Sequence, residues 1–206
     1  SVKSLDGYTF MDCTSLTEIL VDQANTSYKS VDGVLYSKDG KTIVKYPAGK
    51  NATSFEIPVG VTSIDGAAFS SCAKLTGITI PEGVTNIGTS AFAGCSSLTS
   101  ITLPSGVRSI GENAFSNCSS LAKIIYPNTE AQWNAITKDE SWEPNSTYSL
   151  ICISTLVTFD GYFARTVFYN GLRSQYTLDL KALADLEKDY DIEIGMLMAI
   201  AGEDSA

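Results

Sequence analysis

The chain has no histidine among its 206 residues. Histidine is the commonest general base at neutral pH and the commonest transition-metal ligand, and it activates the nucleophile in Ser-His and Cys-His sites. The absence of histidine therefore removes these catalytic arrangements. We predict that the protein is not an enzyme and that it holds no metal and no cofactor.

Basic residues are also scarce. The 14 Lys and Arg residues are outnumbered by 23 Asp and Glu residues, which gives a formal net charge of −9. Residues 1–127 carry ten acidic and nine basic residues (net −1), whereas residues 128–206 carry thirteen and five (net −8). The sequence shows no basic stripe of the kind that binds a phosphate backbone, so we expect no nucleic-acid partner. The difference in charge predicts two different modules.

Long hydrophobic runs are missing as well. No run approaches the roughly 18 apolar residues that are needed to span a bilayer. The N-terminus does not resemble a signal peptide. We therefore expect no membrane insertion of this chain.

The sequence is organised around a 23-residue repeat between positions 61 and 127. Three copies coincide in apolar columns that keep the same spacing. The columns are Val61/Val84/Val107, Ile64/Ile87/Ile110, Ala68/Ala91/Ala114, Phe69/Phe92/Phe115, Cys72/Cys95/Cys118, Leu75/Leu98/Leu121, Ile78/Ile101/Ile124 and Pro81/Pro104/Pro127. Neither a single helix nor a single strand satisfies this spacing, so the period predicts a solenoid with one turn per repeat.

Each turn is predicted to contain a short strand, which in the first copy falls within residues 75–81 and has the pattern L-x-x-I-x-I. Alternation places Ile78 and Ile80 inward and Gly77 and Thr79 outward. The proline that follows has no amide hydrogen and ends the strand.

Two further features are predicted for each turn. In the middle copy, residues 88–92 combine glycine, hydroxyl side chains and a helix-compatible pair, which predicts a single helical turn before Cys95. Val84 and Ile87 predict a second short extended stretch on another side of the coil. The turn therefore has two strand-like sides and one helical corner.

The repeated unit V-x-x-I-G-x-x-A-F-x-x-C-x-x-L-x-x-I-x-I-P resembles the BspA-type leucine-rich repeat of bacterial cell-surface proteins, over roughly residues 1–127. The resemblance implies an α/β solenoid, a leucine-rich-repeat right-handed coil with short strands and short helical turns. It also implies an extracellular or cell-surface location. Asp65 departs from the pattern, because it stands where the later copies have Gly88 and Gly111.

We predict three parts of the chain. Residues 1–127 form the repeats, with a hairpin-bearing long repeat at 23–58. Residues 128–147 form a C-terminal cap. Residues 148–206 form an appended β-rich segment with one helix, interpreted as the beginning of a further module.

The N-terminal part is predicted to be a repeat turn followed by a hairpin. Phe10, Cys13 and Leu16 match the later columns at a shift of 59, so the chain is expected to open inside a repeat. In the long repeat, two β-prone stretches, 33–37 and 42–46, flank an Asp-Gly pair and predict a tight hairpin turn.

The part after Pro127 loses the period. Thr129 is a helix-capping residue, and the sequence after it places Trp133 and Ile136 on one helical face. Together with Trp142 these side chains are predicted to cover the open end of the solenoid. Further on, residues 148–170 predict two or more strands broken by Asp160-Gly161, residues 177–190 a helix, and residues 192–201 a final strand.

The cysteines are interpreted as core residues. Cys13, Cys72, Cys95 and Cys118 share one column and are predicted to stack in the interior, a role that suits free cysteine. Disulfides are disfavoured by the odd total of five, and zinc by the absence of paired C-x-x-C loops. We predict five free thiols.

Two groups of carboxylates could in principle bind calcium or catalyse hydrolysis, and both are interpreted as surface residues. The run 185–191 has alternate carboxylates like a calcium loop, but Tyr190 stands where such a loop needs glycine, so a solvated helix face is favoured. Glu56, Glu82 and Glu112 are scattered and show no convergence of the kind that glycoside hydrolysis requires.

The outward residues of the predicted strands are the candidate binding surface. They are Glu18, Leu20, Ser54, Glu56, Gly77, Thr79, Ser100, Thr102, Lys123 and Ile125. Small hydroxyl side chains make a flat surface on which a partner can lie, and solenoids bind across such faces, although a solvated strand face uses the same residues.

Two functions are compatible with this pattern. The first is an adhesin-like extracellular recognition module that binds a host or matrix protein or glycan, and the second is a structural spacer within a larger surface protein. The sequence names no ligand. We expect a monomer.

Overall fold

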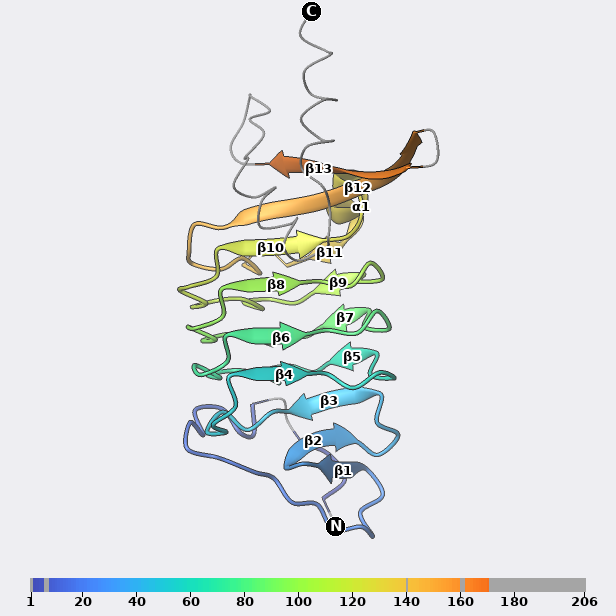
Figure 1. The fold of residues 1–206 in the computed structure, drawn as a ribbon. Helices are drawn as coiled ribbons and strands as arrows, with labels where there is room; N and C mark the ends of the chain where they lie inside the picture. Colours follow the sequence, from blue (N-terminus) through green and yellow to red (C-terminus); the bar gives the residue numbers. More distant parts are fainter. Residues whose placement is uncertain (1, 6–7, 140, 160–161, 171–206) are drawn as a thin grey trace, which may run out of the picture.

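The computed structural model describes residues 2–5, 8–139, 141–159 and 162–170. Turns of the chain stack on one another from the N-terminal end upward, and two columns of short strands run along the stack (Figure 1). The predicted solenoid is confirmed.

The first column of strands contains the L-x-x-I-x-I segments. Its strands are β4 (Ser54–Glu56), β6 (Gly77–Thr79), β8 (Ser100–Thr102), β10 (Lys123–Tyr126), β12 (Ser149–Phe159) and β13 (Tyr162–Asn170). β4 pairs with β6, and β10 pairs with β8 on one side and β12 on the other, all in parallel, while β13 is antiparallel to β12. The inward side chains Ile78 and Ile80 are buried, and Thr79 between them is exposed, as predicted.

The second column forms a seven-stranded sheet in the order β1-β2-β3-β5-β7-β9-β11. Its strands are β1 (Tyr28–Val31), β2 (Val34–Ser37), β3 (Thr42–Lys45), β5 (Ser63–Ile64), β7 (Asn86–Ile87), β9 (Ser109–Ile110) and β11 (Thr137–Lys138). From β3 onward all neighbours are parallel. The predicted second extended stretch between Val84 and Ile87 is present as β7.

The hairpin of the long repeat is confirmed, with one additional strand. β2 and β3 are antiparallel, and Gly40 takes a φ of 78° in the turn between them. The sequence analysis missed β1, which pairs antiparallel with β2 across Asp32 and Gly33. Both turn residues have positive φ, 50° and 76°, the combination that a tight two-residue hairpin turn requires.

The corner expected to be a helical turn is a run of hydrogen-bonded turns instead. The amides of Ala67, Phe69 and Ser71 donate to carbonyls of the next coil at 2.7 to 2.8 Å. The alternate amides, such as that of Ser70, donate three residues back, and Ala67 and Ser71 take φ of 52° and 62°. An α-helix needs negative φ and bonds four residues back. Every second amide therefore donates its hydrogen bond to the next coil and not within a helix, so no helix forms at this corner.

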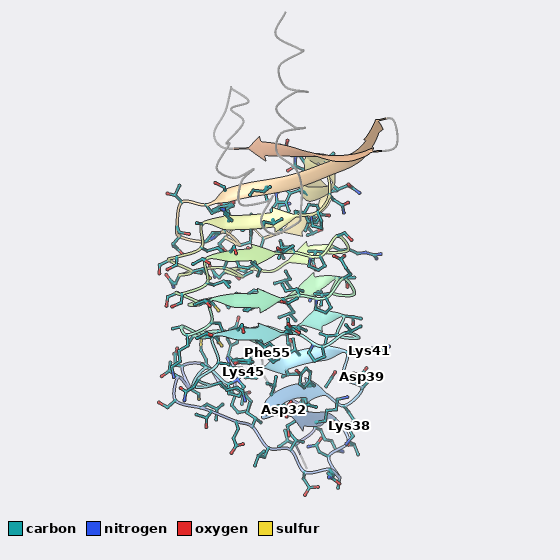
Figure 2. The ribbon with its side chains drawn as sticks, viewed as in Figure 1. Asp32, Lys38, Asp39, Lys41, Lys45 and Phe55 are labelled. Atoms are coloured by element: carbon teal, nitrogen blue, oxygen red, sulfur yellow. The ribbon has the colours of Figure 1, made fainter. Side chains whose placement is uncertain are left out.

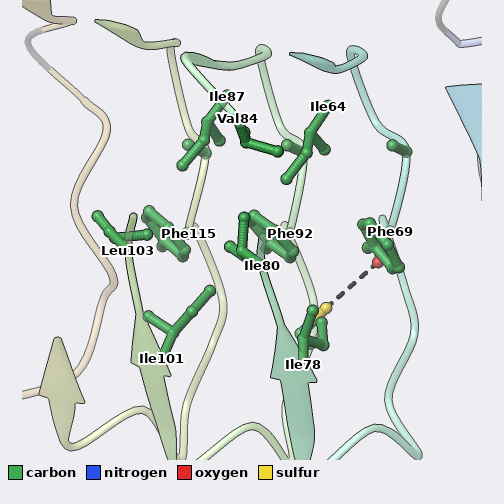
Figure 3. Close-up of a cluster of buried hydrophobic side chains, with 14 of the residues drawn as sticks. Ile64, Phe69, Ile78, Ile80, Val84, Ile87, Phe92, Ile101, Leu103 and Phe115 are labelled. Atoms are coloured by element: carbon green, nitrogen blue, oxygen red, sulfur yellow. Dashed lines mark hydrogen bonds between the residues drawn. The ribbon is translucent and has the colours of Figure 1, made fainter. Parts of the chain in front are cut away.

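A row of stacked aromatic rings fills the interior. Phe69 lies 5.2 Å from Phe92, and Phe92 lies 5.3 Å from Phe115, measured between ring centroids, with nearly parallel planes. Tyr46 continues the row at one end, and Trp142 meets Phe115 edge-on at the other. Figure 3 shows the three phenylalanines in line. The predicted phenylalanine column is the central packing element of the stack.

The first turn keeps the repeat geometry but does not bury its columns. Asp12 has a positive φ of 57°, and Ser71, at the equivalent position 59 residues later, has one of 62°. The Thr14 amide donates to the Asp12 carbonyl, just as the Ala73 amide donates to the Ser71 carbonyl. However, Cys13 is exposed, and the prediction that it lies inside the ladder is wrong. Among the described residues, a coil packs against this turn on one side only.

The helix predicted after Pro127 is confirmed, whereas the boundaries of the cap at 128 and 147 stay a prediction. The helix α1 (Glu130–Ala135) begins with a capping box in which Thr129 accepts from the Gln132 amide. Trp133, Ile136 and Trp142 are buried and join the core cluster of the repeats. The large aromatic rings thus cover the last coil.

The appended segment starts as an extension of the repeats. β12 and β13 confirm the two strands predicted within 148–170. Residues 149–152 of β12 pair in register with β10, and Cys152 joins the core. The predicted helix at 177–190 and strand at 192–201 lie outside the described residues, and the boundary at residue 148 stays a prediction.

Candidate functional site

The structure brings most of the predicted strand-face residues into two adjacent columns. Ser54 and Glu56 of β4 pair with Gly77 and Thr79 of β6. These four residues form the first half of a surface that we call the strand face. Successive residues of a strand point to opposite sides, so every second side chain of these strands points outward.

The second half of the strand face lies on β8 and β10. Ser100 is level with Lys123, and Thr102 is level with Ile125. Ser100 and Thr102 are exposed, and Lys123 is half-buried. The exposed part of the predicted surface is therefore centred on Glu56, Thr79, Ser100 and Thr102, at neighbouring levels of the stack.

Two predicted members stand apart from the strand face. Glu18 and Leu20 are exposed, but neither belongs to a strand. The amide of Ile19 between them donates to the Gly33 carbonyl at 2.9 Å, so the chain turns toward the hairpin and does not continue the column of β4. The repeat pattern did not predict this contact, because the hydrogen-bond partner, Gly33, lies in the hairpin and not in a repeated position.

The prediction that Ile125 belongs to the exposed candidate binding surface is wrong. Ile125 is 8% exposed and packs with Ile151, which is level with it on β12. β12 lacks the 23-residue repeat pattern, and its addition to the sheet was therefore not foreseen. The strand face ends in a covered apolar pair at this level.

A buried lysine is a feature that the sequence analysis missed. Lys45 is 2% exposed, and its Nζ donates to the Ala67 carbonyl at 2.7 Å and to Ser70 Oγ at 2.8 Å. Burial lowers the pKa of this ammonium, and the nearby thiols of Cys72 and Cys13 oppose that shift. Lys45 therefore binds the carbonyl of Ala67, a corner residue with positive φ, and is buried away from any ligand. Its role is structural.

The described residues contain no metal-binding cluster. Within residues 2–5, 8–139, 141–159 and 162–170 there is no group of three or more Cys, Asp or Glu side chains that could hold a metal ion. The buried thiols of Cys72 and Cys118 are held in their neutral form, because burial raises the pKa of Cys72 to about 12 and that of Cys118 to about 11. Such thiols are poor nucleophiles. In the same part of the chain, no helix combines the length and apolar character of a membrane span.

The fold and the exposed strand columns define a class of protein, a leucine-rich-repeat solenoid with an extended surface. Residues 46–141 match the model of the BspA type leucine rich repeat region, which covers six copies. Residues 46–141 are therefore similar to the repeats of that family. The family suggests a surface location and is compatible with a binding or scaffold role, and leucine-rich-repeat proteins are generally non-enzymatic binding modules.

Solved structures of bacterial proteins share the architecture. A leucine-rich repeat protein from Eubacterium ventriosum ATCC 27560 is 36% identical, with a TM-score of 0.55 over 59% of this chain and 32% of that one. The pneumococcal vaccine antigen PcpA is 26% identical, with a TM-score of 0.55 over 66% of this chain and 38% of that one. This chain therefore spans about a third of the length of these relatives. No curated protein matches the chain.

Proposed function

We propose that this chain is a non-catalytic recognition module of an extracellular or cell-surface protein and that it binds a host or matrix protein or glycan through the strand face. The observation that carries the proposal is the alignment of exposed Glu56, Thr79, Ser100 and Thr102 on neighbouring levels of the stack. Thr and Ser lose little side-chain entropy when a partner covers them. Solenoids bind partners across such extended faces.

The rigidity of the backbone below this face supports a binding role. The side chains between the exposed ones, Ile78 and Ile101, are buried in the core. The exposed hydroxyls are therefore held at fixed positions before a partner arrives. Preorganisation of this kind lowers the cost of association.

A structural spacer is the second candidate. The observation in its favour is the uninterrupted aromatic row from Tyr46 to Trp142, which ties successive coils into one stiff body. A spacer needs this stiffness and no ligand. Thr and Ser are also ordinary residues of a solvated strand face.

A pair of charged substitutions separates the two candidates. The variant Thr79→Arg with Thr102→Arg places two bulky cations on the strand face. The control Ser97→Arg with Ser120→Arg places the same two cations, at the same 23-residue separation, on the turns that follow Cys95 and Cys118. Both variants are expected to keep the parent circular dichroism.

Binding is measured on an array of purified extracellular-matrix proteins and neutral glycans. The recognition proposal expects a partner that binds the parent and the control but not the Thr79/Thr102 variant. Equal binding by both variants removes the strand face as the site. The absence of any partner on the array favours the spacer.

A further inference from the structure

Lys29 of β1 reaches the turn of the β2–β3 hairpin, where Lys38 and Lys41 also lie. A Cβ placed on Gly40 would lie 2.5 Å from Lys29 Nζ, so the Lys29 ammonium lies over the turn. Lys38 and Lys41 flank the turn and are exposed (Figure 2). We call Lys29, Lys38, Asp39 and Lys41 the hairpin cluster. β1, the strand that was not predicted, carries Lys29 to this position.

Asp39 is the one carboxylate of the hairpin cluster, and it is already engaged. Its pKa is lowered, first by the hydrogen bond from Ser37 Oγ at 2.6 Å and then by the bond from the Lys41 amide at 3.0 Å. The positive charges of Lys41 and Lys29 lower it further. Asp39 therefore serves the turn and offsets only part of the positive charge.

The hairpin cluster continues into a polar row along the seven-stranded sheet. The Thr62 amide donates to the Lys41 carbonyl at 2.7 Å, the Thr85 amide to the Thr62 carbonyl at 3.0 Å, and the Arg108 amide to the Thr85 carbonyl at 2.9 Å. Lys41 and exposed Arg108 thus stand in one line, three strand spacings of about 4.8 Å apart, or about 14 Å. Thr137 is level with Ser109, one residue further along the strands than Arg108.

A second polar row lies directly beside the first. Asn86 Nδ2 donates to Ser63 Oγ at 3.4 Å, and Ser109 Oγ donates to Asn86 Oδ1. The two rows together form what we call the polar sheet face. Its members are Thr62, Ser63, Thr85, Asn86, Arg108, Ser109 and Thr137.

The charge of this surface is opposite to that of the chain. The hairpin cluster and the polar sheet face hold four cations (Lys29, Lys38, Lys41 and Arg108) and one carboxylate (Asp39), a net charge of +3 on a chain of net −9. Two carboxylates of the same coils are held by other groups. Asp65 accepts from the Gly66 amide, and Glu82 accepts from Ser105. A polyanion is therefore attracted to this surface.

We propose that the hairpin cluster and the polar sheet face together bind an acidic polysaccharide. The cations at the two ends pair with sulfate or carboxylate groups, and the hydroxyl and amide side chains between them exchange hydrogen bonds with sugar hydroxyls. The polar sheet face has no aromatic side chain on which nucleic-acid bases stack, which favours a glycan over single-stranded nucleic acid. This binding is independent of the strand face.

The test compares two triple variants of the full chain that have the same net charge. Lys38→Gln, Lys41→Gln and Arg108→Gln remove exposed cations of the proposed surface. Lys3→Gln, Lys50→Gln and Lys74→Gln remove three cations elsewhere. Surface plasmon resonance is recorded on immobilised heparin, polygalacturonate, neutral dextran and poly-L-glutamate, between about 50 and 200 mM salt.

The parent and the control triple are expected to bind heparin or polygalacturonate, with no binding to dextran. The test triple is expected to bind at least about tenfold more weakly, and its salt slope should fall by about three, one for each removed cation. Equal loss in both triples would show that only total charge matters and overturns the proposal. Equally tight binding to poly-L-glutamate overturns the choice of a glycan, and absence of binding to either acidic polysaccharide overturns the site.

Discussion

The thiol of Cys95 donates a hydrogen bond of 3.2 Å to the main-chain carbonyl of Phe69, one coil earlier in the stack (Figure 3). The same carbonyl already accepts from the Cys72 amide at 3.2 Å. Cys118 repeats the arrangement on the Phe92 carbonyl at 3.1 Å. Each thiol therefore occupies the second lone pair of a buried carbonyl in the preceding coil, which explains why the column prefers a small side chain with a weak donor.

Cysteine labelling should distinguish the end turn from the ladder. All five cysteines are free, with Cys13 exposed and the other four buried. A thiol reagent is expected to label one cysteine in the native protein and five in denaturant without reductant. Cys13→Ser is the control and should reduce the native count to zero. Fast native labelling of two or more thiols, or three or fewer in denaturant, contradicts the assignment.

The buried thiols should make the protein less stable in alkali. Burial raises the pKa of Cys72 to about 12 and that of Cys118 to about 11, from an ordinary value near 9.0. The folded state therefore holds protons that the unfolded state releases, so the stabilisation is complete below pH 9 and is lost as pH rises toward 11 and 12. At about pH 10.5 the loss is on the order of 2 kcal/mol per thiol.

Urea unfolding at several pH values measures this effect. Lys45 acts with the opposite sign, because burial lowers its pKa and its penalty is relieved as pH rises from the lowered pKa toward the ordinary 10.5. Three ladder thiols outnumber this one amine, so the parent should lose stability above pH 9. Cys118→Ala should show a shallower loss than the parent. The same pH slope in both proteins would assign the alkaline effect to other groups.

The aromatic row should carry much of the stability. Phe92 is fully buried and stacks on a ring at each side, so Phe92→Ala is expected to cost about 3 to 5 kcal/mol of unfolding free energy. Phe55 is only partly buried, and Phe55→Ala is the milder control. Both are measured by urea unfolding. A loss below about 1 kcal/mol for Phe92→Ala would show that its cavity is not formed.

Two truncations should locate the end of the solenoid. Deletion of residues 155–206 keeps the pairing of β10 with residues 149–152, so the repeats should still unfold cooperatively. Deletion of residues 148–206 exposes the edge of β10 and removes Cys152 from the core, so the unfolding midpoint should fall clearly. Calorimetry of the two proteins makes the comparison. Equal midpoints would place the boundary at 148, and loss of cooperativity in the longer protein would make the tail part of the cap.

Local patterns were sufficient for the regular part of the fold. The 23-residue columns predicted the inward Phe69, Phe92 and Phe115, because each repeat meets the same neighbours above and below. Thr129 predicted the capped helix, since a capping box needs only residues three apart in sequence. The outward positions Thr79 and Thr102 followed from the alternation of a strand.

The sequence by itself determined the solenoid, its core columns and the side of each strand, because these depend on periodicity and on near neighbours along the chain. Only the tertiary structure decided what happens where the repetition stops. Cys13 fills a repeat position yet is exposed, because the described residues place a coil on one side of its turn only. Ile125 is covered, because β12 adds a strand that carries no repeat pattern. Lys29 and Lys41 form one basic surface, because β1 pairs with β2 and carries Lys29 to the turn beside Lys41. That strand pairing depends on which strands lie side by side in the folded sheet, and the local sequence does not determine it.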